Sequence, residues 1–363
     1  MPYNVYVKVR VTGYVKSRRR EIARGKGVPV SSARFTVQPG ELAFIGGGLH
    51  RPECVLCLAS GALLVSDWRG GVSRILPDGT QCHWLGEHPR GGPLQPNGIA
   101  LSANGTLLIA HLGTEHGGVF RLLPQGRVET VVAAVDGIDL PPTNFPLEDA
   151  AGRLWITVST RLKPRALGYR PTACDGFIVM ADASGARIVA DGLGYTNELA
   201  LHPNGRELWV NETFARRLSR FAIRRGGTLG EKQVVATFGA GTFPDGLAFD
   251  AEGGAWITSI VSNRVIRVAP DGAQQTILED AEAAHLDWVE KAFLSSTMGR
   301  PHLDKPAGKV LQNTSSLAFG GKDLRTAYLG SLQGPRLATF PVPLAGFPPP
   351  HWKRQLDSSY EAT

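Results

Sequence analysis

The 363-residue chain is poor in sulfur and has no long apolar run. It contains four Cys and three Met, and no stretch reaches the ~18 apolar residues of a membrane span. The first residues also lack the apolar core of a secretory signal. These absences argue against a disulfide scaffold and a helical membrane protein. We expect a cytoplasmic protein with no membrane partner.

The few cysteines offer one short motif, Cys54-x-x-Cys57, which raises a zinc or disulfide interpretation. A zinc site of this kind needs a second pair, and the remaining Cys82 and Cys174 do not form one. The motif also lies inside a predicted strand. Reduced, buried thiols are the favoured interpretation.

Excess charge is absent from most of the chain, although the formal net charge is +7. Residues 1–30 contain eight Lys/Arg and one Glu, which leaves 31 basic and 31 acidic residues in the remainder. A nucleic-acid surface needs clustered basic residues on the folded body. We therefore expect no nucleic-acid partner.

The chain has instead a regular internal repeat. Six polar, oxygen-bearing residues each stand eight positions before a turn that leads into an apolar strand, namely Glu53, Asn97, Asn144, Asn197, Asp245 and Ser315. They are separated by 44, 47, 53, 48 and 70 residues. Four-stranded propeller blades repeat at roughly 40 to 50 residues. The sequence therefore predicts an all-β fold, a six-bladed β-propeller.

The segments around these six marked residues give the domain division. Residues 201–210 are typical of each repeat, with two apolar runs joined by a Pro-Asn-Gly turn. We expect a propeller over residues 45–343, a basic N-terminal extension over 1–44 and a C-terminal tail over 344–363. The alternating valines of residues 5–11 predict an edge strand, on the ring or at a subunit contact of a homo-oligomer.

The long last interval contains the one clear helical pattern, at residues 277–293. It predicts a short helical insert between blades 5 and 6. Such an insert would serve as a lid over the pocket or pack on the outside of the ring, and the pattern does not separate these alternatives.

The marked residues share one register, so ring closure brings their side chains toward one end of the channel. Four of them offer hard oxygen donors, namely Glu53, Asn144, Asn197 and Asp245. Such donors suit one divalent cation, with Ca²⁺ favoured and Zn²⁺, Mg²⁺ and Mn²⁺ as alternatives. A single Asn or Asp before a strand is more often a turn residue bonded to its own backbone. The shared register favours the metal site.

Asp245 is the candidate acid/base. Gly246 follows it and would let the backbone approach the axis closely. One carboxylate oxygen would hold the ion and the other would take a proton from water, while the ion polarises a carbonyl. This combination predicts hydrolysis of an ester or a lactone. A covalent nucleophile has no support, because no Gly-x-Ser-x-Gly motif is present.

Further pocket residues are expected on the same rim. Asn97 and Ser315 complete the marked set, and His111 and His116 lie in a blade 2 loop, where His116 would bind substrate unless it is merely solvated. The blade 3 loop over residues 161–170 carries three Arg and one Lys. It would attract a carboxylate-bearing substrate or form a solvated charge cluster.

Three phrases resemble the senescence marker protein / gluconolactonase / luciferin-regenerating enzyme family. They are Pro-Asn-Gly at 96–98, Pro-Asp-Gly-Leu-Ala-Phe-Asp-Ala-Glu-Gly at 244–253 and Ser-Leu-Ala-Phe-Gly-Gly at 316–321. The resemblance runs from about residue 53 to 342. It implies a six-bladed propeller with one divalent metal at the top of the channel, a small-molecule lactone substrate and gluconolactonase-like hydrolysis. It also implies that Glu53, Asn144, Asn197 and Asp245 surround the metal, with Asp245 as acid/base.

The chain departs from the family pattern at three positions. Phe145 stands where members commonly have Asp, Glu198 where they have Gly, and Pro142 where sugar lactonases often have Arg. Phe145 is therefore expected to line the substrate pocket and to favour a less polar lactone.

Two other functional classes remain open. A condensing enzyme resembling strictosidine synthase shares the ring, but Glu53 together with Asp245 argues against it. A non-catalytic propeller that serves as an interaction platform would leave these carboxylates without an ion.

Overall fold

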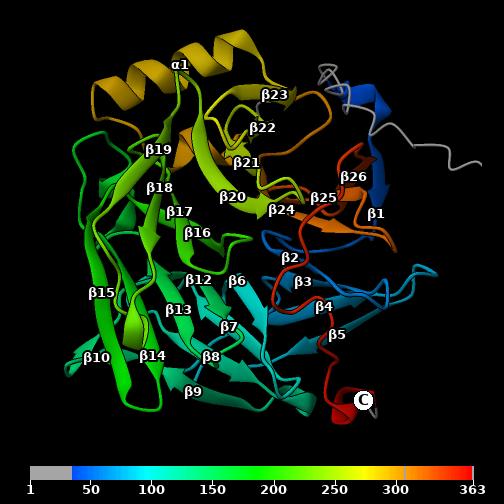
Figure 1. The fold of residues 1–363 in the computed structure, drawn as a ribbon, viewed down its shortest axis with the longest axis vertical. Helices are drawn as coiled ribbons and strands as arrows, with labels where there is room; N and C mark the ends of the chain where they lie inside the picture. The colour runs from blue at the N-terminus through cyan, green and yellow to red at the C-terminus, as the bar shows by residue number, and fades with distance from the viewer. Residues whose placement is uncertain (1–34, 306–307, 362–363) are drawn as a thin grey trace, which may run out of the picture. The chain divides into compact units, whose positions relative to one another are not determined.

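The structure, a computed structural model, describes residues 35–305 and 308–361, so the edge strand expected at residues 5–11 lies outside the described residues. Six four-stranded antiparallel sheets form a ring, with β2, β6, β12, β16, β20 and β24 nearest its centre (Figure 1). The predicted six-bladed propeller is confirmed.

Each of the first five blades is a meander whose first strand is innermost. The strands are β2 (Val55–Cys57), β3 (Leu63–Asp67), β4 (Gly71–Ile75) and β5 (Gln81–Leu85); β6 (Pro96–Leu101), β7 (Leu107–His111), β8 (Val119–Leu122) and β9 (Val128–Val132); β12 (Thr143–Glu148), β13 (Leu154–Val158), β14 (Gly176–Asp182) and β15 (Gly185–Leu193); β16 (Thr196–Leu201), β17 (Glu207–Glu212), β18 (Arg217–Ala222) and β19 (Gln233–Thr237); β20 (Phe243–Phe249), β21 (Ala255–Ile260), β22 (Arg264–Val268) and β23 (Gln274–Leu278).

The sixth blade is completed by the N-terminal side of the described chain. Its strands are β24 (Thr314–Gly320), β25 (Thr326–Ser331), β26 (Leu337–Pro341) and, outermost, β1 (Ala43–Ile45). β1 pairs antiparallel with β26, so that Ala43 lies opposite Thr339. Residues near the two ends of the described chain therefore close the ring together. β1 also spans the boundary expected between residues 44 and 45.

The remaining elements are short. They comprise the hairpin β10 (Ala134–Val135) and β11 (Ile138–Asp139), the helices α1 (Ala283–Leu294) and α2 (Arg300–Asp304), and the 3-10 turns η1 (Pro39–Glu41), η2 (Pro124–Gly126), η3 (Arg165–Gly168), η4 (Arg225–Gly227) and η5 (Ser358–Tyr360).

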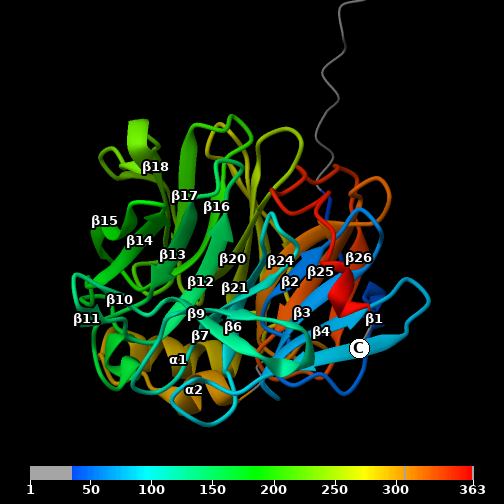
Figure 2. The ribbon, with the colours of Figure 1, turned by 90° about the horizontal axis from the view of Figure 1, so that it is seen from below.

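The helical insert between blades 5 and 6 is confirmed, but the start predicted for it was wrong. Ile277 and Leu278 end the strand β23, and α1 begins only at Ala283. A buried apolar pair fits either a strand or a helix by periodicity. α1 and α2 lie together at one face of the ring (Figure 2). Val289 and Phe293 are buried there, and the Phe293 ring meets Phe243 of β20 edge-on at 5.2 Å.

The blades pack face to face, so their inner strands are buried on both faces. All six residues of β21, for example, are buried. This explains why the inner strands read as apolar runs rather than as strict alternation. Aromatic pairs join adjacent blades: Trp209 meets Phe249 at 5.2 Å, and Trp256 meets Phe319 at 5.2 Å. Edge-to-face packing of this kind stabilises the contact beyond the apolar area that it buries.

Regular pairing fails at the marked residue in blades 2 to 6. In blade 5 the register passes from Pro244 directly to Leu247, and equivalent shifts occur in the other four blades. Such a bulge leaves its residues outside the ladder and turns their side chains. It therefore frees Asp245 from the flat surface of the blade.

Side chains from other strands replace the missing ladder bonds around Asp245. Gly246 N donates to Thr258 Oγ1 at 2.7 Å, while Asn211 Nδ2 donates to the carbonyls of Asp245 and Gly246, each at 3.0 Å. Asn211 belongs to β17 of the preceding blade. The bulge is thus held by the adjacent strand of its own blade and by the preceding blade, and few of its polar groups are left unpaired.

The C-terminal segment crosses the end of the channel opposite the marked residues. It bonds in turn to the inner-hairpin turns of three blades, through Ala251 N to Ala345 O at 2.8 Å, Ala59 N to Trp352 O at 2.8 Å and Asp357 N to Gly105 O at 3.0 Å. Figure 1 shows this segment in red in front of the ring. As far as residue 361, the tail expected over residues 344–363 thus packs against the propeller through these bonds.

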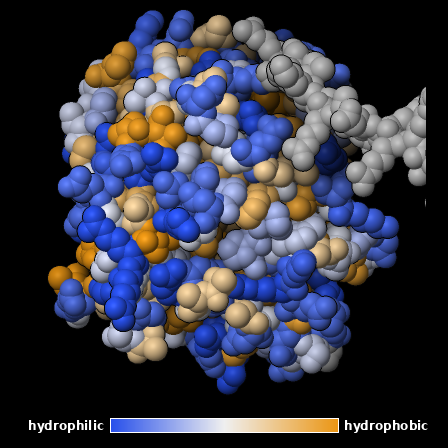
Figure 3. Space-filling view, viewed as in Figure 1, coloured by the Kyte–Doolittle hydropathy of each residue, from blue (hydrophilic) through white to orange (hydrophobic). Residues whose placement is uncertain are grey.

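The surface, the helices and the cysteines can be compared with what the sequence led us to expect of membrane helices and thiols. The face in Figure 3 mixes polar residues with small apolar groups. In the part of the chain that the structure describes, no helix has the length and apolarity needed to cross a bilayer. All four cysteines are free, and Cys54 and Cys57 are buried as expected, whereas Cys174 is exposed.

We predict that Gly246→Ala destabilises the fold. A Cβ at this position would lie 2.6 Å from Ser315 O and 2.7 Å from Thr258 Oγ1, so the backbone of two blades must shift. Overpacking of this kind costs about 1 to 3 kcal/mol. Chemical denaturation checks this against Gly239→Ala, where a Cβ would meet nothing within 4 Å. Equal unfolding midpoints for the two variants would contradict the account.

Candidate metal and catalytic site

Four of the six marked residues meet in one pocket at the end of the channel. Glu53, Asn144, Asn197 and Asp245 all line it, each from a different blade. Their side chains are buried, with residue exposures of 2% to 6%. The structure thus brings together the four residues that the sequence assigned to a metal.

The orientation of Asn197 is fixed by a short chain of hydrogen bonds. Thr213 Oγ1 donates its hydrogen to Pro244 O at 2.8 Å, so it must accept from Asn197 Nδ2 at 3.1 Å. The amide nitrogen of Asn197 is therefore committed to Thr213. Its carbonyl oxygen is left to face the pocket.

Two buried oxygens in this pocket have no hydrogen-bond donor among the described residues. They are Oδ1 of Asn144 and Oδ1 of Asn197. A buried acceptor without a donor is costly, and these two lie beside two carboxylates in one pocket. Oxygen donors of this type are the ligands that hard divalent cations take. The donor set therefore fits a Ca²⁺-like ion.

The four donors do not include the His and Cys ligands that are typical of a zinc site. No group of three or more His, Cys, Asp or Glu able to hold a metal occurs in residues 35–305 and 308–361. The candidate set has only two carboxylates, and its other donors are amides. Zn²⁺ usually recruits imidazole or thiolate. The chemistry of the donors favours a harder ion.

The pocket disfavours negative charge on Asp245. Burial raises the pKa of this carboxyl well above its ordinary value, and the neighbouring Glu53 and Glu198 raise it further. Burial likewise raises the pKa of Glu198 to about 8. A bound cation would relieve the repulsion between carboxylates that causes part of this shift.

The rest of the pocket wall combines cations and aromatic rings with Thr213 and the aliphatic side chains of Ile260, Leu303 and Leu332. Arg51, Arg165 and Arg300 line it together with Tyr169 and Tyr195. Arg51 Nη2 lies 2.7 Å from Glu53 Oε2, and Arg51 Nε donates to the same oxygen at 2.9 Å. The Arg51 guanidinium also stacks over Trp68 at 4.4 Å. Glu53 thus keeps one oxygen, Oε1, without a bond to Arg51.

The other two marked residues have different roles. Ser315 Oγ donates to the backbone carbonyl of Glu53 at 2.8 Å, which ties the first blade to the sixth. Asn97 is buried, and its Oδ1 has no donor among the described residues. Neither residue is among those that line the pocket of the four donors.

The histidines of the blade 2 loop lie elsewhere. His116 lines a separate hollow with His88, and its Nδ1 is 3.5 Å from Asp139 Oδ2. His111 stacks on His88 at 4.4 Å. Burial and the two neighbouring histidines lower the pKa of His111 to about 4. Neither ring lines the pocket of the four donors.

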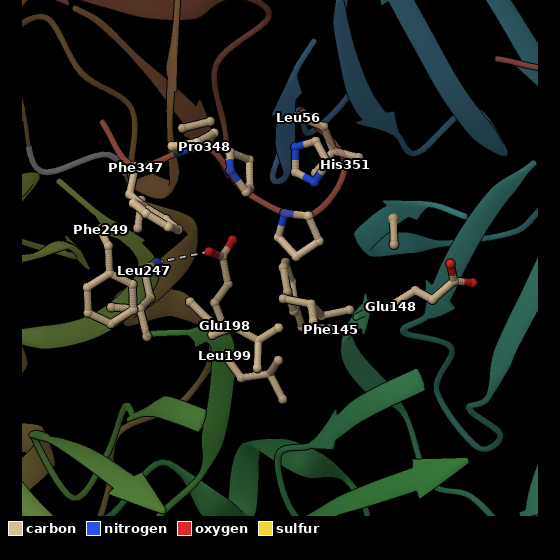
Figure 4. Close-up of a pocket in the computed structure, with 18 of the residues that line it drawn as sticks. Leu56, Phe145, Glu148, Glu198, Leu199, Leu247, Phe249, Phe347, Pro348 and His351 are labelled. Carbon is tan, nitrogen blue, oxygen red and sulfur yellow. Dashed lines mark hydrogen bonds between the residues drawn. The ribbon is translucent and has the colours of Figure 1, made fainter. Parts of the chain in front are cut away.

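Phe145 and Glu198 line a second, apolar cavity of about 320 Å³ in the channel, between the candidate site and the C-terminal segment. Figure 4 shows Glu198 reaching into it, with Phe145 on one side and Phe347, Pro348 and His351 of the C-terminal segment across it. Glu198 Oε2 accepts from Leu247 N at 2.9 Å. Phe145 does not line the candidate site, where three arginines do, so the preference for apolar lactones expected from Phe145 has no support there.

The sequence indicated some of the other residues that line this pocket and gave no indication of one of them. Arg165 and Tyr169 belong to the loop that the sequence singled out, and Arg51 stands two residues before Glu53. Arg300 is the first residue of α2 in the insert, and nothing in its local sequence indicates a place in the pocket. Its position depends on how the insert folds back over the ring.

Comparison with known proteins gives one family and a consistent fold. The family model described as SMP-30/Gluconolactonase/LRE-like region matches residues 52–282. A curated relative from Pseudomonas putida, named 6-deoxy-6-sulfogluconolactonase, is 28% identical over 225 residues. That match covers 61% of this chain and 65% of the relative, slightly less than two thirds of its length.

Two solved structures illustrate the fold. A gluconolactonase from Xanthomonas campestris matches with a TM-score of 0.61 at 21% identity, over 83% of this chain and 89% of that one. A calcium-binding protein, regucalcin, from Agrobacterium tumefaciens matches with a TM-score of 0.56 at 17% identity, over 86% and 93%. At these identities the two structures support the propeller fold alone.

We predict that Asp245→Asn stabilises the metal-free protein at neutral pH. The folded-state pKa of this carboxyl is raised, so the folded protein holds its proton longer than the unfolded chain does, and wild-type stability falls as pH rises through the ordinary Asp range. In chelator at pH 7 the variant should melt higher by on the order of a few degrees. The gain should shrink as pH approaches 4.

Thermal melts over this pH range, with Asp287→Asn on the exposed face of α1 as the control, check the result. A gain that does not depend on pH would contradict it.

Proposed function

Because the chain belongs to the SMP-30/gluconolactonase/LRE-like family, we propose that it is a metal-dependent lactonase that opens the ring of a small-molecule lactone. One observation carries this proposal. Two carboxylates and two donor-less amide oxygens, from four blades, line a single pocket at the end of the channel. The names of the Pseudomonas putida and Xanthomonas campestris proteins, both lactonases, support the reaction class.

The proposed metal ligands are Glu53, Asn144, Asn197 and Asp245. A divalent cation bound there would polarise the lactone carbonyl and stabilise the negative charge that develops on its oxygen. The description of regucalcin as calcium-binding supports Ca²⁺ as the ion. The hardness of the four oxygen donors supports the same choice.

Asp245 is proposed as the acid/base. It holds a water molecule by one carboxylate oxygen, takes the proton as the water attacks the ring carbonyl, and returns it to the departing ring oxygen. A carboxylate that would bind the cation by one oxygen keeps its other oxygen available to take up and release this proton. Asn211, bonded to the backbone carbonyl of Asp245, keeps the carboxylate in place during the transfer.

We predict that Asp245→Asn abolishes most turnover. The amide still offers an oxygen to a cation but cannot accept a proton, and loss of a general base typically costs about 10²- to 10⁴-fold in rate. The measurement is kcat for a panel of lactones in Ca²⁺, Mg²⁺, Mn²⁺ and Zn²⁺, each against a chelated sample. Wild-type protein should lose activity in chelator and regain it with one of these ions.

Near-normal turnover by the variant would transfer the role of base to another residue. Wild-type activity that persists in chelator would defeat the metal-dependent part of the proposal. Failure to hydrolyse any lactone of the panel would defeat the reaction class.

We predict that Asn197→Ala weakens the affinity for a divalent cation by at least tenfold. The substitution removes a buried oxygen donor while Thr213 stays in place. Isothermal titration of metal-free protein with Ca²⁺ measures both affinity and stoichiometry, and wild-type protein should bind one ion. Asn204→Ala, in an exposed turn of the same blade, is the control and should bind as the wild type does. Unchanged affinity in Asn197→Ala would remove this residue from the ligand set.

A further inference from the structure

The pocket of the four oxygen donors holds more positive charge than its carboxylates need. Three guanidinium groups line it from three separate segments: Arg51 precedes β2, Arg165 begins η3, and Arg300 begins α2. Two of them have carboxylate partners. Arg51 pairs with Glu53 at 2.7 Å, and Arg300 pairs with Asp304 of the same short helix.

Arg165 differs from both. Within residues 35–305 and 308–361 its side chain forms no hydrogen bond and no ion pair, although Glu53 and Asp245 attract it electrostatically. It is only partly exposed and shares the pocket wall with Tyr169 and Arg300. Two other cations of its loop are engaged away from the pocket: Arg161 pairs with Asp191 at 2.8 Å, and Lys163 Nζ donates to Glu115 O at 2.8 Å. The remaining one, Arg170, does not line the pocket. Among the cations of this loop, Arg165 is therefore the one that lines the pocket and can bind a ligand there.

The support for Arg165 is rigid. The Tyr169 ring, one residue beyond η3, packs edge-on against Tyr195 at 5.5 Å and lies 4.8 Å from the Phe214 ring. A Cβ on Gly168 would lie 3.0 Å from the Tyr195 ring, so η3 is seated closely on this aromatic cluster. Tyr169 and Arg300 line the same pocket and interact electrostatically. These contacts fix η3, which begins with Arg165, at the pocket wall before any ligand arrives, which reduces the entropy cost of binding.

Charge balance makes the same point. Glu53 already pairs with Arg51, and Glu53 and Asp245 are also the proposed ligands of the cation, so a loaded site leaves no carboxylate of the pocket to balance Arg165. Arginine presents a planar fork of donors that matches the oxygens of carboxylate, sulfonate or phosphate. A neutral substrate would leave this partly buried cation uncompensated.

We infer that Arg165, assisted by Arg300 and Tyr169, binds an anionic group of the substrate, so that the lactone opened here carries a carboxylate, sulfonate or phosphate away from its ring carbonyl. This inference rests on the proposed lactonase function. It adds the class of substrate and names Arg165 as the residue that selects it. The ring carbonyl would then face Asp245 while the anion lies on the wall formed by η3 and α2.

The experiment measures kcat/KM of the full chain for matched lactones of equal ring size, one neutral and the others bearing a carboxylate, a sulfonate or a phosphate. Wild-type protein should prefer at least one anionic member. In Arg165→Gln the ratio of anionic to neutral kcat/KM should fall about ten- to a hundredfold, mainly through KM, since charged hydrogen bonds are worth this much. Arg165→Lys should recover part of the ratio, because it keeps the charge but not the fork.

Arg161→Gln is the matched control on the same loop, and its ratio should follow the wild type. An equal loss for neutral and anionic lactones in Arg165→Gln, or no loss, overturns the inference and assigns Arg165 a structural role. If wild-type protein opens no lactone at all, the proposed function fails. The anion site is then tested by ligand binding instead of by activity. Titration with methanesulfonate, in chelator and in Ca²⁺, should then show binding to the wild type that Arg165→Gln loses, and equal binding to both proteins overturns it.

Discussion

The irregular start of the inner strands is the constraint on which the site depends. If β20 paired regularly with β21 to its first residue, the Asp245 side chain would stand on the flat of the blade, among the residues that separate blades 4 and 5. The bulge removes Asp245 and Gly246 from the ladder, and Thr258 and Asn211 take over their backbone groups. The same irregularity recurs in five blades. A repeated defect in pairing therefore places polar side chains at the centre of an apolar ring.

The two ends of the channel are chemically opposite. At one end carboxylates, amides and guanidinium groups meet in a small pocket, and at the other an apolar cavity lies under the C-terminal segment. Glu198 stands between them and contributes to the electrostatics of both, because it raises the pKa of Asp245 and of the Cys54 thiol. This buried carboxyl makes the polar end less tolerant of further negative charge. The surrounding arginines act in the opposite direction.

The sequence alone predicted the blade count and the common register, since both follow from the spacing of turns and the two-residue period of a strand. It also selected the four residues that line one pocket, because equivalent positions in a closed ring must converge. It placed Phe145 in the substrate pocket, whereas the structure places this residue in the apolar cavity. The residue after the marked position lies further along the channel, away from the end where the four donors meet. The sequence could not find Arg300, whose place depends on the tertiary course of an insert. His116 was placed on the rim by its loop, whereas in the structure it lies in a hollow beside Asp139 of the β10–β11 hairpin.

Closure of the sixth blade by β1 has a consequence for biosynthesis. Ala43 emerges from the ribosome almost 300 residues before Thr339, its partner in β26. At roughly 5 to 20 residues per second, β1 waits on the order of 15 to 60 seconds for its partner strand. During that time the growing chain is an open arc with unpaired strand edges. Because β1 has only three residues, it exposes few unpaired backbone groups to incorrect strand pairing during this time. The same short length means that few hydrogen bonds join β1 to β26 in the closed ring.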